Sequence, residues 1–388
     1  MLLKVRAGFP IFLAALNMRA GLVLMAPLLP IISKYYELSA TQMSILLSIP
    51  IVAFSSSSLI MGALGRRASS DRIITAALVT LALALALRTF TGVIGLFVFT
   101  ALIGISIAVM NYEVPVWVKV HLPESTGLAT GIYVTLMGVG ASIAVAVSVP
   151  IAEATSFSWK LSMLPWMLFS TFAAIYWMLK RRNVDTERSS DYAPFWRTSA
   201  IKNPIAWGLV LFFGIESMTF YGSASWLPTI LTTKHFSLSG AGAAIAFSGL
   251  MGSAVGIFFP HWISKFKDQR LLLAGVSILT GFSFFMMTVQ DGKILILWLC
   301  LSNIGISMAF PACLLLCSIK ATTPEMTRTL STMMQSIGYI ISATGPIYVS
   351  TIFHLAGNWN TALYAIALLS GLQLLVTLYV GKPTKIDR

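Results

Sequence analysis

Apolar segments of 19 to 28 residues recur about every 30 residues along this 388-residue chain, and this recurrence limits its fold more than any other feature. A helix of about 20 residues spans the roughly 30 Å hydrocarbon core of a bilayer. Only 10% of the residues are charged, where an ordinary soluble domain carries about 25%. The sequence therefore predicts an all-α membrane protein with twelve transmembrane helices. The predicted spans are 8–32, 41–64, 73–91, 93–117, 126–152, 160–179, 204–231, 238–263, 271–289, 293–318, 327–353 and 359–380.

The basic residues predict the orientation of these helices. If the N-terminus is cytoplasmic, 20 of the 26 lysines and arginines fall on the cytoplasmic side and one lies inside the membrane. Such an excess is the positive-inside pattern, so we expect both termini in the cytoplasm and a multi-pass protein of the inner (plasma) membrane. The net charge of +13 then faces anionic lipid headgroups, and we expect no nucleic-acid partner. The five basic residues assigned to the opposite side are Lys34, Arg88, Lys160, Lys234 and Lys293.

An internal repeat divides the chain into two similar halves. The segment that begins at Gly104 recurs from Gly305, and Lys119 recurs as Lys320, both at an offset of 201. The pair Leu29-Pro30 recurs as Leu227-Pro228 at an offset of 198. We therefore predict two parallel six-helix bundles, residues 1–182 and 201–388, joined by a cytoplasmic linker over 183–200. Pro27, Pro30 and Pro346 should bend the helices that contain them.

One arginine lies close to the middle of the first apolar segment. Arg19 is 11 residues into the span 8–32, and an arginine at that depth costs roughly 2.5–3.5 kcal/mol on insertion scales. Ionisable groups inside the membrane generally line a water-filled cavity or meet a partner. We expect Arg19 to line a transport pathway; the alternative is a structural arginine bound to backbone carbonyls or an acid. Asn17 precedes it by two residues, about 200° around the helix, so one of the two side chains faces the cavity and the other a neighbouring helix.

Five short motifs lie along nearly the whole chain: Leu16-Asn-Met-Arg19, Ala26-Pro-Leu-Leu-Pro30, Ser225-Trp-Leu-Pro228, Ala309-Phe-Pro311 and Met334-Gln-Ser-Ile-Gly-Tyr339. In these motifs the sequence resembles the cyanate permease and 2-nitroimidazole transporter family of the major facilitator superfamily, whose substrate site lies near the midplane between two parallel six-helix halves. The resemblance implies secondary transport of a small, often anionic or nitrogen-rich solute.

Two features depart from the family pattern. The basic loop between the second and third helices resembles the superfamily's gating loop, and we assign Arg66, Arg67, Asp71 and Arg72 to it. It has no aspartate where the common pattern places one, because Asp71 comes too late. The second departure is Glu216, in place of the uncharged polar residue that the resemblance implies.

Glu216 lies 12 residues after Pro204, close to the depth of Arg19 in its own segment. We hypothesise that Arg19 and Glu216 form a charge pair or hold a solute between them; the alternative is that Glu216 meets only a local hydroxyl or backbone group. Opposite charges about 4 Å apart attract by roughly 4 kcal/mol at an effective dielectric of 20. Protonation of Glu216 would couple transport to a proton gradient. Glu113 is a second proton-coupling candidate, although a headgroup-reaching or locally paired acid is the simpler interpretation.

Several aromatic and amide side chains could complete a solute site through hydrogen bonds and stacking. Gln335 and Tyr339 are four residues apart and share a helix face, which favours joint action. The alternative for each of these residues is that it only packs against neighbouring helices or belongs to the aromatic belt at the membrane–water interface. The other candidates are Asn111, Tyr112, Tyr133, Tyr221 and Trp226.

The sequence contains no phosphate-binding loop, metal-ligand cluster or nucleophile with a matched histidine, so we expect neither an enzyme nor a cofactor. We expect a monomer that transports a small molecule by alternating access, with protons as a possible coupling ion. Three functions remain open: uptake or exchange of a small anion such as cyanate, proton-driven export of a drug-like or nitroheterocyclic compound, and a membrane sensor that does not transport.

Overall fold

The structure is a computed structural model that describes residues 2–56, 68–122, 126–156, 158–180 and 195–386. In these ranges it contains eleven helices long and apolar enough to cross a membrane, together with the shorter apolar helix Ala40–Ser55. The all-α fold predicted from the apolar segments is thus confirmed. The chain divides into two compact units, Met1–Tyr192 and Ala193–Arg388. Of the predicted linker, residues 183–194 lie outside the described ranges.

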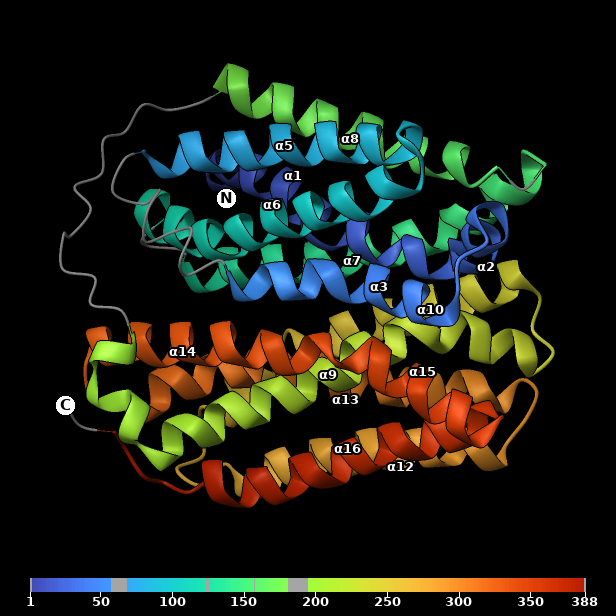
Figure 1. The fold of residues 1–388 in the computed structure, drawn as a ribbon. Helices are drawn as coiled ribbons and strands as arrows, with labels where there is room; N and C mark the ends of the chain where they lie inside the picture. The colour runs from blue at the N-terminus through green and yellow to red at the C-terminus, as the bar shows by residue number, and fades with distance from the viewer. Residues whose placement is uncertain (1, 57–67, 123–125, 157, 181–194, 387–388) are drawn as a thin grey trace. The chain divides into compact units, whose positions relative to one another are not determined.

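The first unit contains seven described helices (Figure 1). They are α1 (Leu2–Val23), α2 (Met25–Tyr36), α3 (Ala40–Ser55), α5 (Ser70–Phe90), α6 (Gly92–His121), α7 (Thr126–Ala154) and α8 (Trp159–Lys180).

The second unit begins with two short 3₁₀ helices, η2 (Phe195–Arg197) and η3 (Ser199–Lys202). Its α-helices are α9 (Pro204–Thr233), α10 (Leu238–Gly256), α11 (Phe259–Ile263), α12 (Arg270–Val289), α13 (Ile294–Lys320), α14 (Pro324–Ala343), α15 (Gly345–Ala356) and α16 (Trp359–Val380).

The two units use the same helix pairs. In the first unit α1 packs on α7, α3 on α6 and α5 on α8; in the second α9 packs on α14, α10 on α13 and α12 on α16. Each pair joins segments of the same rank in its half of the chain. The internal repeat seen in the sequence therefore corresponds to a repeated pattern of packing.

Proline explains where three apolar segments break into two helices. α1 ends at Val23 and α10 at Gly256, which lie four residues before Pro27 and Pro260. A proline has no N–H for the carbonyl four residues earlier, and its ring clashes with that carbonyl. α14 likewise ends at Ala343, shortly before Pro346. The bends thus lie about one turn before the prolines that cause them.

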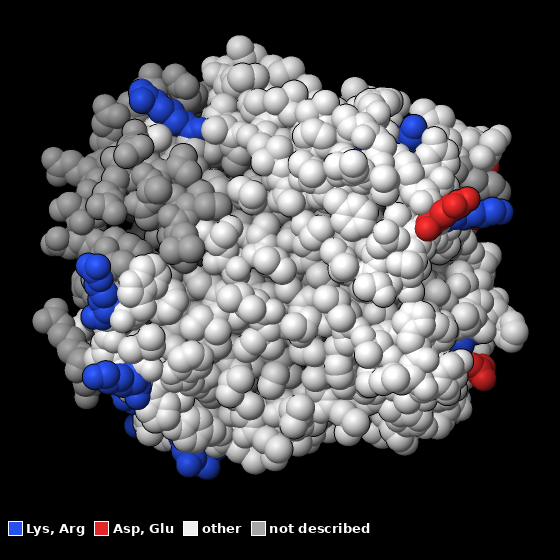
Figure 2. Space-filling view, viewed as in Figure 1, with Lys and Arg blue, Asp and Glu red and all other residues white. Residues whose placement is uncertain are grey.

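Charged side chains gather at the ends of the helices. On the face shown in Figure 2, Lys, Arg, Asp and Glu of the described residues lie towards the two ends of the helices, and uncharged surface covers the region between. Exposed apolar side chains such as Ile94, Leu168 and Leu375 contribute to the uncharged surface of the protein. This distribution is the one expected of helices surrounded by acyl chains.

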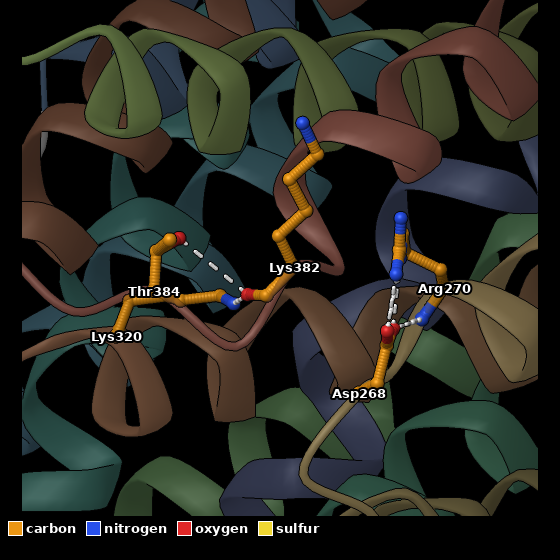
Figure 3. A network of polar contacts seen from close by, with 5 residues as sticks. All are labelled: Asp268, Arg270, Lys320, Lys382 and Thr384. Carbon is orange, nitrogen blue, oxygen red and sulfur yellow. Dashed lines mark hydrogen bonds and ion pairs between the residues drawn. The ribbon is translucent and has the colours of Figure 1, made fainter.

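The C-terminal residues of the second unit are bound to the end of α13 (Figure 3). The Lys320 ammonium donates to the carbonyl of Lys382, and the amide of Ile386 donates to the carbonyl of Lys320. Near the start of α12, Arg270 donates to both carboxylate oxygens of Asp268 at 2.6–3.0 Å.

The Asp268–Arg270 pair gives a pH-dependent prediction. The Arg270 hydrogen bonds lower the pKa of Asp268 from 3.8 to about 2. A depressed folded-state pKa contributes stability that is present above the unfolded pKa and is lost as the pH falls through the folded value. We expect Asp268→Asn to melt at a slightly lower temperature than wild type at neutral pH, with the difference vanishing between about pH 4 and pH 2. Differential scanning fluorimetry across this range measures it; a difference that grows on acidification would contradict the assignment.

Candidate functional site

Arg19 lies on the one partly exposed stripe of an otherwise buried helix segment. From Ile11 to Leu24, only Phe12, Leu16, Arg19 and Val23 are partly exposed, at spacings of four, three and four residues. Its neighbours Met18 and Ala20 are buried. Such spacing is one face of an α-helix. Arg19 therefore projects from the only face of this segment that its neighbours do not cover completely.

Asn17 faces the interior of the first unit. Its amide nitrogen donates to the Leu13 carbonyl at 2.9 Å, and its amide oxygen accepts from the Ser170 hydroxyl of α8 at 2.7 Å. The side chain is only 1% exposed. The Ser170 bond joins α1 to α8. Asn17 is therefore the member of the pair Asn17 and Arg19 that faces a neighbouring helix.

A glycine brings α7 against α1 one turn before Arg19. A Cβ atom added to Gly140 would overlap the carbonyl oxygen of Leu16 and would lie 3.0 Å from its Cα. Backbone atoms cannot move aside as a side chain can, so only glycine permits this approach. The segment that carries Arg19 is thereby fixed against α7.

A second arginine, predicted from the sequence to lie on the side of the membrane opposite the cytoplasm, is buried. Arg88 is 0% exposed. It lies in the last turn of α5, a position that resembles a loop residue in sequence but is covered by α1 and α8. Its guanidinium donates to the Gly21 carbonyl of α1 at 3.3 Å and contacts the Met163 sulfur of α8 at 3.4 Å.

The Arg88 bond reaches α1 at the start of its bend. The amide that would normally donate to the Gly21 carbonyl belongs to Met25, which lies beyond the break at Leu24. Arg88 supplies a charged donor at this position, two residues after Arg19. A buried charge is costly unless it is hydrogen-bonded, so this bond should fix the geometry of the bend.

Replacing Arg88 with methionine should loosen the bend while leaving the fold intact. The substitution removes the donor to Gly21 and also removes the desolvation cost of a buried charge, so the two effects on the free energy of unfolding oppose each other. We expect faster hydrogen–deuterium exchange over residues 21–27, with a melting temperature close to wild type. Thr89→Val is the matched control, because the Thr89 hydroxyl donates to the Leu85 carbonyl of α5 and to the Met167 sulfur of α8, and neither partner lies in α1. Unchanged exchange in Arg88→Met would contradict the role assigned to Arg88.

Other predicted residues of the first unit differ in exposure. Asn111 and Tyr112 on α6 are partly exposed, and Tyr133 on α7 is buried. Glu113 is 0% exposed, so the interpretation that it reaches the headgroup region is wrong. Its position one and a half turns from the end of the predicted segment suggested solvent, but α6 continues to His121 and neighbouring helices cover it.

The predicted gating loop is only partly described. Arg66 and Arg67 lie outside the described residues, and Arg72 is exposed. Asp71 is buried in the first turn of α5 and accepts a hydrogen bond from the Trp117 indole of α6 at 2.5 Å. A carboxylate in the first turn also complements the helix dipole. Asp71 thus joins α5 to α6 within the first unit.

In the second unit, Glu216 lies on α9 and is 2% exposed. The hydroxyl of Ser217 donates to its Oε2 at 2.8 Å, which is the local hydroxyl partner considered from the sequence. A hydrogen bond to the carboxylate favours its charged form, whereas burial favours the neutral form.

Tyr339 of α14 lies beside α9, and Gln335 lies one turn earlier on α14. The Tyr339 ring meets Phe213 edge-on, with centroids 5.0 Å apart, and Phe213 is three residues before Glu216. Gln335 is partly exposed and donates to the Ser331 hydroxyl at 3.0 Å. Helices α9 and α14 thus bring Glu216 and Tyr339 into one region of the second unit.

Trp226 and Tyr221 are placed differently. The Trp226 indole donates to the Pro346 carbonyl of α15 at 2.9 Å and lies against Trp359 with centroids 5.4 Å apart. Tyr221 is buried on the same helix, next to Phe220. The Trp226 indole N–H is therefore already used to hold the bend between α14 and α15.

Two glycine contacts give the register between the repeats. Gly140 meets Leu16, and a Cβ at Gly338 would lie 2.5 Å from Phe213 and 3.5 Å from the amide of Gly214. Positions 16 and 214 differ by 198, as do positions 140 and 338. At this offset Arg19 corresponds to Ser217, and Glu216 to Met18. Arg19 and Glu216 are thus not equivalent positions of the repeat: each lies one residue from the position that corresponds to the other. Their similar depths in the apolar segments do not show this difference of one residue.

The fold and these buried polar groups define a polytopic α-helical membrane transport protein. The Major Facilitator Superfamily profile matches residues 11–346, and the chain belongs to this superfamily of transporters. It is 30% identical over 381 residues to the 2-nitroimidazole transporter of Escherichia coli (strain K12), covering 97% of this chain and 95% of the relative. It is 26% identical over 351 residues to the cyanate transport protein CynX of the same organism, covering 89% and 90%.

The fold also agrees with a solved structure. A bacterial homologue of the human lysosomal transporter Spinster, in an inward-facing and occupied conformation, superposes with a TM-score of 0.77 at 15% identity. The match covers 97% of this chain and 96% of that structure.

Proposed function

We propose that this transporter moves a small solute with an anionic or nitro-type oxygen terminus across the inner membrane, and that Arg19 binds that terminus. The observation that carries the proposal is the position of Arg19, which lies on the single partly exposed stripe of the otherwise buried segment from Ile11 to Leu24. A guanidinium offers parallel N–H donors that match paired oxygens. Carboxylate and nitro groups have such a pair, and linear cyanate presents one terminal oxygen or nitrogen atom at a time.

Other residues support the site within their own units. Gly140 and Arg88 fix α1 on either side of Arg19, and Asn17 ties it to α8. In the second unit, Glu216, Gln335 and Tyr339 are the polar groups that we assign to the solute, with Asn111, Tyr112 and Tyr133 as further candidates in the first. Alternating access of a central site in a monomer, with both termini in the cytoplasm, completes the proposal.

Proton-driven efflux of a nitroheterocycle is the second candidate. It is favoured by the 30% identity to a relative named as a 2-nitroimidazole transporter and by the buried carboxylate of Glu216. A carboxylate that alternates between its charged and neutral forms could carry the coupled proton. In this account the Glu216 carboxylate carries the proton, and Arg19 binds the nitro group of the solute.

Counterflow in proteoliposomes tests the proposal. Vesicles loaded with unlabelled cyanate, a small carboxylate, a zwitterionic amino acid or 2-nitroimidazole are diluted into the labelled form of the same solute. Accumulation of cyanate, carboxylate or nitroimidazole, without the zwitterion, supports the proposed solute class. If 2-nitroimidazole is the only solute that accumulates, and if its accumulation requires a proton gradient, the result favours the second candidate. No flux of any solute favours the membrane sensor and contradicts both transport proposals.

A further inference from the structure

An open groove lies in the second unit where α9 begins and α16 ends. Its volume is about 560 Å³, and it lies outside the polar groups assigned to the solute. It is lined by Ile201, Lys202, Pro204, Trp207, Gly208, Leu211, Leu375, Val376 and Tyr379. All of these residues belong to η3, α9 or α16, so the groove is formed within one unit.

The floor and walls of the groove are apolar. Gly208 forms a close approach of α9 to α16, since a Cβ there would lie 2.7 Å from Val380 and 3.2 Å from Tyr379. Leu211 and Leu375 form the walls and are 44% and 63% exposed. The stretch from Pro204 to Leu211 extends about 10 Å along the helix axis. An acyl chain segment fits a wall of this length and character.

The rim of the groove is amphipathic and basic. Trp207 donates its indole N–H to the Ile201 carbonyl at 2.8 Å, which orients the ring at the edge of the bundle. The Lys382 ammonium lies 5.8 Å from the centroid of the Tyr379 ring, and Lys202 lines the same groove. Figure 3 shows the Lys382 side chain directed away from Lys320, which holds its backbone carbonyl. Trp, Tyr and Lys together are the side chains typical of a membrane–water interface.

We propose that this groove binds an anionic glycerophospholipid of the cytoplasmic leaflet, with an acyl chain between Leu211 and Leu375 and the headgroup at Lys202 and Lys382. Charge complementarity selects this occupant, because Lys202 lines the groove and the Lys382 ammonium lies beside the Tyr379 ring at its rim. The leaflet follows from the predicted topology, which places the start of α9 and the end of α16 on the cytoplasmic side, where anionic lipids and their negative surface potential reside.

Native mass spectrometry of the full-length protein in detergent tests this site, with phosphatidylglycerol and phosphatidylcholine of identical acyl chains as probes. We expect phosphatidylglycerol to bind more tightly, and the variant Lys202→Gln/Lys382→Gln to lose about fivefold in affinity for each lysine removed. The matched control is Lys265→Gln/Lys267→Gln, which removes two exposed lysines of the same unit outside the groove. Inorganic phosphate should compete weakly, because it lacks the acyl chain.

A variant that fills the groove distinguishes binding of the acyl chain in the groove from attraction of the headgroup to the lysines. Leu211→Trp should weaken both lipids while retaining the lysines, and its melting temperature without lipid verifies that it folds. Equal binding of the two lipids, equal loss in the control variant, or unchanged binding in Leu211→Trp would each overturn the proposal. Full competition by inorganic phosphate would show that the groove binds anions and not the acyl chain, and would also overturn the proposal.

Discussion

Replacing Arg19 with alanine should abolish solute-induced stabilisation and reduce counterflow to a small fraction of wild type. Truncating one partner of a desolvated, hydrogen-bonded charge contact typically costs about 2–5 kcal/mol, which is a loss of thirtyfold or more in affinity. Because Arg19 is partly exposed, the melting temperature of the solute-free protein should change little. Thermal-shift titration with the solute identified by counterflow measures both quantities.

Arg19→Lys is the informative companion. It retains the charge and loses the planar fork of donors, so we expect intermediate affinity for a two-oxygen solute and near wild-type affinity for one with a single charged atom. Full solute-induced stabilisation in Arg19→Ala would contradict binding at this residue. A large fall in the solute-free melting temperature would instead support the structural arginine considered from the sequence.

Gly140→Ala should impair folding and transport together, although it adds only one methyl group. The new Cβ would overlap the backbone of Leu16, and overpacking of this kind typically costs about 1–3 kcal/mol. α1 must shift where it carries Arg19, so we expect a lower melting temperature and a large loss of counterflow. Gly338→Ala should have a smaller effect, because its Cβ would meet the Phe213 ring, which can rotate.

Gly275→Ala and Gly371→Ala are matched controls. Both glycines are helical, and a Cβ at either has no atom within 4 Å. Alanine has a higher helix propensity than glycine by about 1 kcal/mol, so these variants should be neutral or slightly more stable. If Gly140→Ala behaved like them, the close contact between α1 and α7 would not be a constraint on transport.

The helices were predictable because hydrophobicity alone determines which segments enter a bilayer. The predicted span 359–380 has the bounds of α16, and most others agree within a few residues. The bends were expected at prolines, but the breaks lie about one turn earlier, at Leu24 and Thr344. Proline acts on the carbonyl four residues before it, so the residue that causes a break is not the residue where it occurs.

The candidate site was predictable only in part. The midplane depth of Arg19 and its 200° separation from Asn17 follow from helix geometry and need no tertiary information. The burial of Arg88 and Glu113 depends on which neighbouring helices cover their ends, and residues near the ends of apolar segments resemble loop residues in sequence. The hydrogen bond from the Trp226 indole to the Pro346 carbonyl joins residues 120 positions apart, so no local sequence pattern predicts it.

The central claim is that Arg19 faces a water-filled pathway, and cysteine labelling tests it most directly. With Cys300, Cys313 and Cys317 replaced, Met18→Cys, Arg19→Cys and Ala20→Cys are each exposed to a hydrophilic, membrane-impermeant thiol reagent in reconstituted vesicles. The account predicts rapid labelling at position 19 and little labelling at positions 18 and 20. Equal or absent labelling at all three positions would contradict it.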